Sequence, residues 1–481
     1  MPRRTKIVAT LGPATDEKQI LDDMIKAGMD VVRVNFSHGD PEDHIRRAED
    51  VRNRARAFGH QVGVFADLQG PKIRIGSFRE GRITLSKDDH FILDAGLDIT
   101  AGTQERVGLT YKGLPDDVSR GDTLLLDDGR IVLWVDDVTG TEVGCRVVIG
   151  GVLSNSKGIN RHGGGLSAAA ITDKDRRDIE VAARMGADYV AVSFPRSADD
   201  IRLARELLHD AGGYGGIVAK IERAEALNAL EEIIKAADVV MIARGDLGVE
   251  IGDAELPAVQ KRIIKIARSL DRVVITATQM MQSMIKSPIP TRAEVFDVAN
   301  AVIDGTDAVM LSAETATGKY PAKVIEAMDR ICAGAERQRS MQASERRTNM
   351  RFRRADEAIA KATMYTANSL GVKAIAALTE SGATPLWMSR ISSGIPIYAM
   401  TRHVETRRKV TLYRGVYPVS FDVTSTIHAE VNREAIDELV RRGAVRNGDL
   451  VIITKGDLMG VHGGTNAMKI IEVGEHEIMQ E

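Results

Sequence analysis

Eight short apolar runs, each followed by a helical pattern, constrain this chain more than any other feature of its sequence. The runs lie at 6–12, 31–39, 62–70, 189–194, 216–222, 239–246, 272–280 and 308–315. Runs of this length without polar alternation are typical of strands buried on both faces of a parallel sheet. Eight strand–helix units favour a closed (β/α)8 TIM barrel, with a doubly wound open sheet as the alternative. No GxGxxG follows a strand, which disfavours a dinucleotide-binding fold.

The alternation of strands and helices breaks off after the third strand. Short alternating runs and turn pairs such as Asp128-Gly129 predict a small antiparallel β domain, an inserted β-barrel lid. The insertion leaves and re-enters at the C-terminal end of a strand, the face that carries the active site in such barrels. We therefore expect a mobile lid, with a merely decorative insertion as the alternative.

A chain of 481 residues is too long for one core, and its length predicts two or three domains. The barrel takes residues 1–69 and 168–345, the lid takes 70–167, and a C-terminal α/β domain that binds an effector takes 346–481. An arginine-rich stretch before about residue 356 is interpreted as a linker. Five further apolar runs with intervening helical patterns predict the sheet of the last domain.

Composition excludes several classes of function. A net charge of -3 predicts no nucleic-acid partner and no anionic membrane surface. The two cysteines, Cys145 and Cys332, lie far apart and exclude a disulfide framework. No apolar run approaches the roughly 18 residues of a membrane helix. The N-terminus enters a strand pattern at once, without a signal-peptide pattern. We expect a cytoplasmic protein.

Polar residues gather where the predicted strands end. They are Arg33, Asn35 and Ser37 on the second strand, Asp67 on the third with Lys72 and Arg74 just beyond it, Lys220, Glu222, Arg244 and Asp246 on the fifth and sixth, and Thr276, Thr278, Ser312 and Glu314 on the last two. Side chains two apart share one face of a strand, so Lys220 and Glu222 point the same way. With Asp246, they indicate a divalent-metal site with a cationic partner; salt bridges to loops are the alternative.

This rim combines cations with carboxylates but has no clear nucleophile–base pair. Such a site suits the binding and movement of phosphoryl groups, because metal, Arg and Lys neutralise charge. The backbone N–H groups of Gly245 and Asp246 could hold a substrate carboxylate. The residues therefore predict metal-dependent chemistry on a small phosphorylated acid. In the C-terminal domain, Thr379, Ser381 and Thr384 precede a helix and could bind a phosphate, although an ordinary helix cap is the alternative.

Five motifs, in order, resemble the pyruvate kinase family over essentially the whole chain. They are RVNFSHG, KIERAEAL, ARGDLGVE, ATQMMQSM and LSAETATGKYP. The resemblance implies phosphoryl transfer from phosphoenolpyruvate to ADP, giving pyruvate and ATP in the last step of glycolysis. It also implies Mg2+ (or Mn2+) as cofactor, allosteric regulation and a homotetramer.

The resemblance implies a role for each matching residue. Glu222 and Asp246 would bind Mg2+. The catalytic residues would be Lys220, Thr278 and Arg33, and Gly245 and Asp246 would join them in binding the substrate. The nucleotide would be lined by Asn35, Phe36, Ser37, His38, Arg74 and Lys157. The proton that converts enolpyruvate to pyruvate would arrive through Thr278 and water.

Two departures from the family pattern bear on ions and regulation. Lys72 stands where potassium-dependent members have a glutamate, near Asn35, Ser37 and Asp67, the family's monovalent-cation ligands. A tethered cation can substitute for a bound one, so we expect that K+ is not required. The loop TESGATP lacks the arginine that many relatives have after the glycine. The resemblance to the short bacterial type then implies a sugar monophosphate or AMP as effector, bound by Thr379, Ser381 and Thr384.

Two other classes of function compete with this interpretation. One is a different Mg2+-dependent barrel enzyme that acts on the enolate of phosphoenolpyruvate; such an enzyme would not need Lys157 and Arg74 in a lid. The other is a non-catalytic metabolite sensor, which intact Lys220, Glu222 and Asp246 disfavour.

Overall fold

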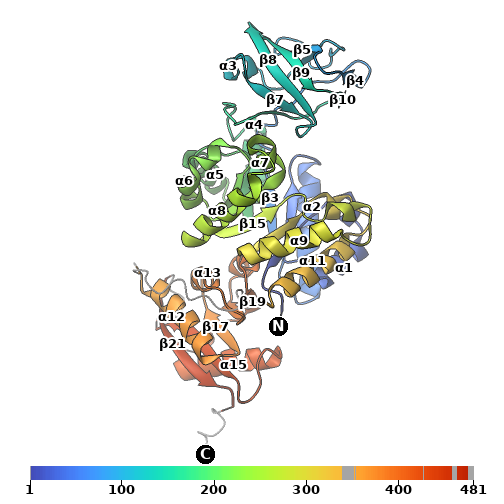
Figure 1. Ribbon diagram of the computed structural model, residues 1–481. Coiled ribbons are helices and arrows are strands. Elements are labelled where there is room, and N and C mark those ends of the chain that lie inside the picture. The colour runs from blue at the N-terminus through green and yellow to red at the C-terminus, as the bar shows by residue number, and fades with distance from the viewer. Residues whose placement is uncertain (1, 339–351, 353, 426, 458–462, 475–481) are drawn as a thin grey trace, which may run out of the picture. The chain divides into compact units, whose positions relative to one another are not determined.

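The computed structural model describes residues 2–338, 352, 354–425, 427–457 and 463–474 (Figure 1). The chain divides into two compact units, and each is described by itself. The first comprises Met1–Ala66, Arg184–Tyr189 and Ile264–Glu481, and the second comprises Asp67–Ala183 and Val190–Ile263. Most of the predicted arginine-rich linker lies outside the described residues.

Eight strands form a closed barrel, which confirms the predicted fold class. They are β1 (Lys6–Thr10), β2 (Val31–Asn35), β3 (Gly63–Asp67), β12 (Tyr189–Val192), β13 (Gly216–Ile221), β14 (Val239–Ala243), β15 (Val273–Ala277) and β16 (Ala308–Leu311). The strands follow one another around the barrel in chain order, and β16 closes it by parallel pairing with β1. Every strand ends one to four residues before the predicted end, so several predicted strand-end residues lie in turns or helices.

Helices follow the strands as the alternation predicts. They are α1 (Lys18–Lys26), α2 (Pro41–Ala57), α4 (Asp173–Arg184), α5 (Ala198–Asp210), α6 (Leu230–Ala236), α7 (Arg244–Ile251), α8 (Leu256–Ser269), α9 (Arg292–Asp304), α10 (Ala313–Ala316) and α11 (Pro321–Ala335), with short 3-10 turns at Pro13–Thr15, Glu225–Leu227 and Gln282–Ile285. Their ends carry the expected signals. For example, Thr291 and Glu294 form a capping box at the start of α9, and Gly305 ends it in the left-handed region. No described helix is long and apolar enough to cross a membrane.

The insertion is a β domain with its own core, as predicted. Its elements are β4 (Arg82–Leu85), β5 (His90–Asp94), β6 (Arg106–Gly108), α3 (Leu114–Asp117), β7 (Thr123–Leu126), β8 (Ile131–Thr139), β9 (Glu142–Ile149), β10 (Gly151–Ser154) and β11 (Ile159–Arg161). Six strands form a sheet in the order β11-β7-β8-β9-β5-β6, and β10 pairs with β4 separately. The β5–β6 pair is parallel, so the domain is not purely antiparallel. Buried alternate residues such as Leu124, Leu126, Leu133 and Val135 form its core.

The C-terminal domain has the five predicted strands in one sheet, in the order β19-β18-β17-β20-β21. Its elements are α12 (Ala355–Leu370), β17 (Ala374–Leu378), α13 (Ala383–Ser389), β18 (Ile397–Thr401), α14 (Val404–Lys409), a 3-10 turn (Val410–Leu412), β19 (Val416–Ser420), α15 (His428–Arg441), β20 (Leu450–Gly456) and β21 (Thr465–Glu472). Apolar residues of α15 pack on one face of the sheet. Helix α12 contacts β20 and β21, and β21 is an antiparallel edge strand.

Buried charges join the C-terminal domain to the start of the barrel strands, within the first unit. Arg390, which follows α13 and is 1% exposed, forms a bidentate ion pair with Asp307, immediately before β16. One of its Asp307 contacts measures 2.9 Å, and Asp307 also accepts the N–H of Val274 at 2.9 Å. Arg414 Nη1 donates to Thr306 O at 2.8 Å. These contacts form a seam between the domain and the barrel.

Candidate active site

Lys220 is the centre of a buried polar cluster in the second unit. Its ammonium donates to Ser193 Oγ at 2.7 Å and lies 2.9 Å from Glu222 Oε1 and 3.2 Å from Asp67 Oδ1. Asp67 ends β3, and Glu222 directly follows β13. Lys220 and Glu222 therefore lie on the same side, as strand alternation predicts. Ser193, which was not among the predicted residues, fixes the ammonium and donates in turn to Leu68 O at 2.7 Å.

The carboxylates of this cluster have unusual electrostatics. Glu222 is 2% exposed and Asp67 1%. Burial raises the pKa of Glu222 to about 7, and the charges of Asp246 and Asp67 add to this effect while Lys220 opposes it. Burial likewise raises the pKa of Asp246, against the influence of Lys220 and Lys72. Burial therefore disfavours the ionised form of both carboxylates, and a bound cation would offset this effect.

Two carboxylates are a suitable protein contribution to a magnesium site. Within the described part of the chain, no group of three or more His, Cys, Asp or Glu side chains could hold a metal unaided. Mg2+ usually binds through one or two carboxylates, with waters and substrate phosphates completing its shell. Glu222 and Asp246 therefore fit a metal that substrate helps to coordinate.

Asp246 lies in the first turn of a helix, and not on a strand as predicted. Strand β14 ends at Ala243, and α7 begins at Arg244 without an intervening loop. The first N–H groups of a helix point out of its N-terminus and favour anions. Gly245 and Asp246 are thus placed where a substrate carboxylate could bind. Arg244 is buried, and its guanidinium lies 3.5 Å from Gln260 Oε1.

Lys72 belongs to the same electrostatic cluster. Burial lowers its pKa to about 8, and Arg74 and Lys220 lower it further, while Asp67 and Asp246 oppose this effect. Lys157, another predicted basic residue of the lid, instead forms an ion pair with Asp127 at 2.7 Å. In the second unit the structure thus groups Lys72, Asp67, Lys220, Glu222 and Asp246, while the ammonium of Lys157 is held by Asp127.

The predicted site residues Arg33, Asn35 and Ser37, in the first unit, lie at or just after the end of β2. Arg33 donates to Thr10 Oγ1 at 3.2 Å, and Asn35 is the last residue of the strand. Ser37 lies in the following turn, where its N–H donates to Asn35 Oδ1 at 3.1 Å. The prediction that Ser37 lies on the second strand was therefore wrong. The turn also contains Phe36 and His38, whose N–H donates to Asn35 O at 3.4 Å.

Thr278 has a strained backbone. Strand β15 ends at Ala277, and Thr278 follows with φ +66°, a region that β-branched residues rarely adopt. Its hydroxyl donates to Ala277 O at 2.7 Å. Phe194, directly after β12 and Ser193, also has a positive φ of 56°, and its N–H donates to Glu222 Oε2 at 2.8 Å. Such conformations persist mainly where surrounding structure enforces them, often at functional sites.

Three other residues that were predicted at strand ends, Thr276, Ser312 and Glu314, make contacts within the protein that stabilise the local structure. Thr276 is fully buried, and its hydroxyl lies 3.0 Å from that of Thr306. Glu314 is in the short helix α10, is buried, and accepts the N–H of Ser312 at 2.7 Å. These residues organise the backbone at the ends of β15 and β16, and Glu314 lies in a helix and not on the eighth strand as predicted.

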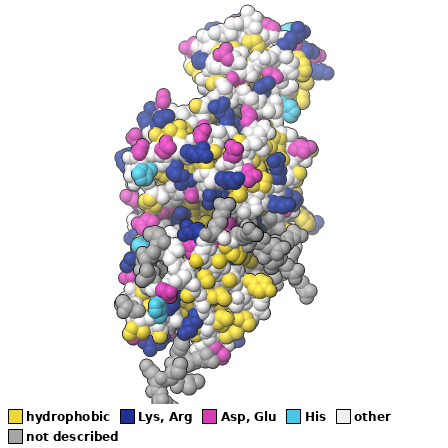
Figure 2. All heavy atoms as spheres, turned by 90° about the vertical axis from the view of Figure 1, so that its left-hand side faces the viewer, with side chains coloured by type: hydrophobic (Ala, Val, Ile, Leu, Met, Phe, Trp, Pro, Cys, Tyr) yellow, Lys and Arg dark blue, Asp and Glu magenta, His cyan; other side chains and the backbone are white. Residues whose placement is uncertain are grey.

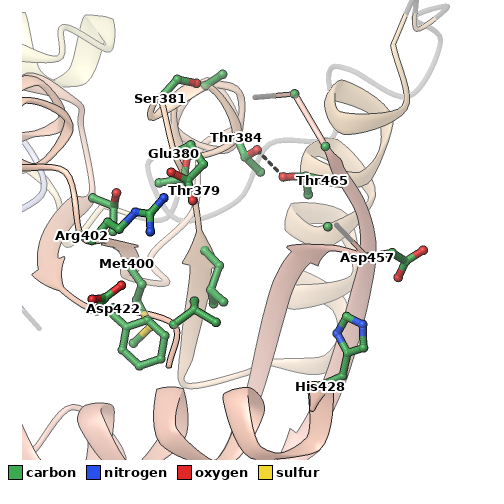
Figure 3. A pocket seen from close by; sticks show the side chains of 18 of the residues that line it. Thr379, Glu380, Ser381, Thr384, Met400, Arg402, Asp422, His428, Asp457 and Thr465 are labelled. Atoms are coloured by element: carbon green, nitrogen blue, oxygen red, sulfur yellow. Dashed lines mark hydrogen bonds between the residues drawn. The ribbon is translucent and has the colours of Figure 1, made fainter. Parts of the chain in front are cut away.

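A separate cavity of about 520 Å3 lies in the C-terminal domain (Figure 3). Its lining includes the three predicted residues, and Thr384 Oγ1 lies 3.0 Å from Thr465 Oγ1. Thr379 Oγ1 accepts the N–H of Gly382 at 2.9 Å, so it shapes the turn before α13. Arg402, which follows β18, also lines the cavity and was not predicted, because no local pattern links it to the TESGATP loop.

A closed barrel of eight parallel strands, with a buried lysine and two carboxylates where its strands end, has the architecture of a (β/α)8-barrel enzyme. The family model described as "Pyruvate kinase, barrel domain" matches residues 2–325, and "Pyruvate kinase, alpha/beta domain" matches residues 357–471. The chain therefore belongs to the pyruvate kinase family, and it is a kinase.

The sequence is similar to those of individual relatives over nearly its full length. The chain is 56% identical to pyruvate kinase II of Salmonella typhimurium over 475 residues, which cover 98% of this chain and 99% of the relative. It is 55% identical to pyruvate kinase of Haemophilus influenzae, over 94% of this chain and 96% of the relative. It is 43% identical to pyruvate kinase of Geobacillus stearothermophilus, over 98% of this chain and 80% of the relative.

Proposed function

We propose that this protein transfers the phosphoryl group of phosphoenolpyruvate to ADP, giving pyruvate and ATP in the last step of glycolysis. The observation that carries the proposal is the buried ammonium of Lys220, held between two carboxylates and Ser193. A fixed positive charge in a site of low dielectric stabilises charge that develops during phosphoryl transfer. Family membership supports the substrate assignment.

Each residue of the site has its own role in the proposed reaction. Glu222 and Asp246 would hold Mg2+ (or Mn2+), which supplies Lewis-acid neutralisation of enolate and phosphoryl oxygens when bound. Lys220 stabilises the phosphoryl group in transfer, and Arg33 contacts the phosphate. Thr278 and the amides of Gly245 and Asp246 orient the substrate carboxylate, and Thr278 with water delivers the proton to enolpyruvate.

The nucleotide and monovalent-cation roles rest on the resemblance and on local geometry. The nucleotide would lie against Asn35, Phe36, Ser37, His38, Arg74 and Lys157. We propose that the ammonium of Lys72 serves the monovalent-cation site of Asn35, Ser37 and Asp67, so that K+ is not required. The influence of Asp67 on the pKa of Lys72 supports this substitution.

A coupled assay separates the proposal from its rivals. ADP and phosphoenolpyruvate are supplied together, and pyruvate is detected through NADH oxidation by lactate dehydrogenase. We expect turnover that requires both substrates and a divalent metal. Consumption of phosphoenolpyruvate without ADP would instead indicate another Mg2+-enolate enzyme. Lack of any turnover would favour a metabolite sensor.

The raised pKa of Glu222 predicts pH-dependent metal affinity. Protons compete with the metal when pH falls below about 7, because a ligand carboxylate must be ionised. A single group of this pKa should make Mn2+ bind the substrate-free enzyme about tenfold more weakly at pH 6 than at pH 8. Electron paramagnetic resonance of free Mn2+ measures this change. Glu222→Gln should remove most of the pH dependence, and equal affinity of the wild type at both pH values would contradict the prediction.

We propose that the cavity of the C-terminal domain binds the phosphate of a sugar monophosphate or of AMP, through Thr379, Ser381 and Thr384. The hydroxyl groups and Arg402 at its wall support this proposal. The bound effector would regulate the enzyme allosterically, and a titration of effectors at sub-saturating phosphoenolpyruvate identifies the activator. Equal activation by all sugar phosphates would contradict selectivity.

Ser381→Asp tests the predicted effector site directly. A carboxylate at this position should repel the effector phosphate and raise the concentration for half-maximal activation by roughly tenfold or more, the effect of about 1.4 kcal/mol. The measurement is the activation curve at sub-saturating phosphoenolpyruvate. Ser269→Asp, at an exposed position of α8, is the matched control and should activate as the wild type does. An unchanged curve for Ser381→Asp would place the effector elsewhere.

We propose that the protein forms a homotetramer in the cytoplasm. Figure 2 shows hydrophobic side chains gathered on the C-terminal domain over α12 and β21, where Tyr365, Leu370, Met468 and Ile470 are exposed. On α9, Phe296 is 74% exposed. Exposed apolar groups on an edge strand and a helix favour contact with further copies. Light scattering of the native protein tests the proposal, and a monomer mass would contradict it.

A further inference from the structure

A second, much smaller cavity lies at the seam between the C-terminal domain and the barrel, within the first unit. Its volume is about 20 Å3. The polar side chains that line it are Arg4, Arg268, Arg414, Ser389, Ser392 and Ser393. The other described lining residues are apolar or glycine, and no Asp or Glu is among them. A cavity lined by guanidinium and hydroxyl groups without a carboxylate is suited to an anion.

Positive charge is in excess around this cavity. Three buried arginines, Arg4, Arg390 and Arg414, face two buried carboxylates at the seam, Glu336 and Asp307. Arg390 pairs with Asp307 in bidentate fashion. Arg4 and Arg414 therefore share Glu336, whose carboxylate lies 3.5 Å from Arg4 Nε and 4.0 Å from Arg414 Nη2. Two guanidinium groups thus lie close to one carboxylate.

Arg414 provides an independent sign of a missing ligand. Its side chain is 9% exposed. Nη1 donates to Thr306 O at 2.8 Å and Val302 O at 3.2 Å, whereas the buried Nη2 makes no hydrogen bond to any described residue. Burial lowers the pKa of Arg414, and the charge of Arg4 lowers it further, against Glu336. Buried polar groups normally have partners, so this nitrogen needs an acceptor that the described residues do not supply.

Ser392 supplies a second donor at the same cavity. Its Oγ accepts a hydrogen bond from Arg268 Nη2 at 3.3 Å. Among the described residues its hydroxyl hydrogen has no acceptor, so it can turn toward a ligand. Arg268 also donates to Arg390 O at 3.1 Å, which holds the guanidinium at the cavity wall. Donors from the barrel helix α8 and from the C-terminal domain thus meet at one point.

The volume limits what can bind. A cavity must have a volume of about 10–15 Å3 to hold one water molecule. The cavity therefore has room for one small spherical ligand and excludes phosphate esters, unlike the 520 Å3 cavity of the same domain. We propose that it binds a single monatomic anion of the chloride class, on Arg414 and Ser392, and that this anion stabilises the attachment of the C-terminal domain to the barrel.

Anomalous diffraction of the full-length wild-type protein, crystallised in sodium bromide, tests the location. Bromide scatters anomalously and replaces chloride in halide sites. We expect a peak within hydrogen-bond distance of Arg414 Nη2 and Ser392 Oγ. A cavity that holds only water, or bromide peaks only at other positions, would overturn the proposal. This experiment needs no variant and does not depend on the catalytic or effector assignments.

Thermal unfolding in solution tests the energetic role. At constant ionic strength, replacing sodium gluconate by sodium chloride should raise the Tm of the wild type by roughly 2–4 °C, with saturation. Arg414→Met and the milder Ser392→Ala should lose most of this increment. Arg202→Met, which removes an exposed arginine on α5, is the control and should keep it. An equal chloride response in Ser392→Ala and the wild type would overturn the proposal even where Arg414→Met does not fold.

Discussion

Replacing Lys220 by methionine should lower kcat by roughly a thousandfold or more, since removal of one preorganised charge at a phosphoryl-transfer site has effects of this order. Methionine keeps much of the length and bulk of the lysine but has no charge. The ammonium that lies between Glu222 and Asp67 would be lost, and with it the stabilisation of the migrating phosphoryl group. Steady-state rates at saturating phosphoenolpyruvate, ADP and Mg2+ measure this loss.

The binding of substrate distinguishes a catalytic from a structural effect in this variant. An interaction made chiefly in the transition state affects kcat more than ground-state affinity, so Mg2+ and phosphoenolpyruvate should still bind Lys220→Met. Lys235→Met is a matched control, because Lys235 forms an exposed helix ion pair with Glu231. Its kcat should equal that of the wild type. A decrease of less than tenfold for Lys220→Met would contradict the assigned role.

Replacing Lys72 by glutamate should make the enzyme depend on K+. Without K+, the carboxylate adds negative charge near Asp67 and Asp246, and we expect the rate to fall by about a hundredfold, the effect of roughly 3 kcal/mol of lost charge stabilisation. Saturating K+ should restore most of the rate. Assays use a bulky organic cation in place of Na+ and K+, which are then added back separately.

Two controls make the test of Lys72 specific. Lys87→Glu introduces the same charge change at an exposed position of the lid and should remain independent of K+. In the wild type, the rate without K+ should fall as pH rises through about 8, because the lysine then loses its charge. A large loss of wild-type rate in the organic cation at pH 7 would contradict the proposed substitution of K+ by Lys72.

The fold could be predicted from sequence because burial on both faces leaves a clear apolar pattern. The ends of the strands could not. The run at 239–246 continues into α7, because nothing in Ala-Arg-Gly-Asp separates the last strand residue from the first helical one. The positive φ of Thr278 was equally hidden, since a threonine gives no local sign of that conformation.

Site residues that lie far in sequence from the groups they contact were also not predicted. Ser193 is the last residue but one of the predicted run 189–194, and a polar residue at that place was a usable signal. Arg402 gave none, because only the pairing of β17 with β18 brings it to the TESGATP loop. Lys220 and Glu222 were found because strand alternation is a local rule that the fold preserves.

The contact of Arg390 with Asp307 limits how the protein can be divided. Asp307 is almost fully buried, and it also anchors Val274 at the start of the neighbouring strand. A C-terminal domain without an arginine at this position would leave this carboxylate buried without its cation, at a cost of about 3–5 kcal/mol. The catalytic and regulatory parts are therefore not interchangeable modules: a chimera with a relative's C-terminal domain must bring an arginine to the same place.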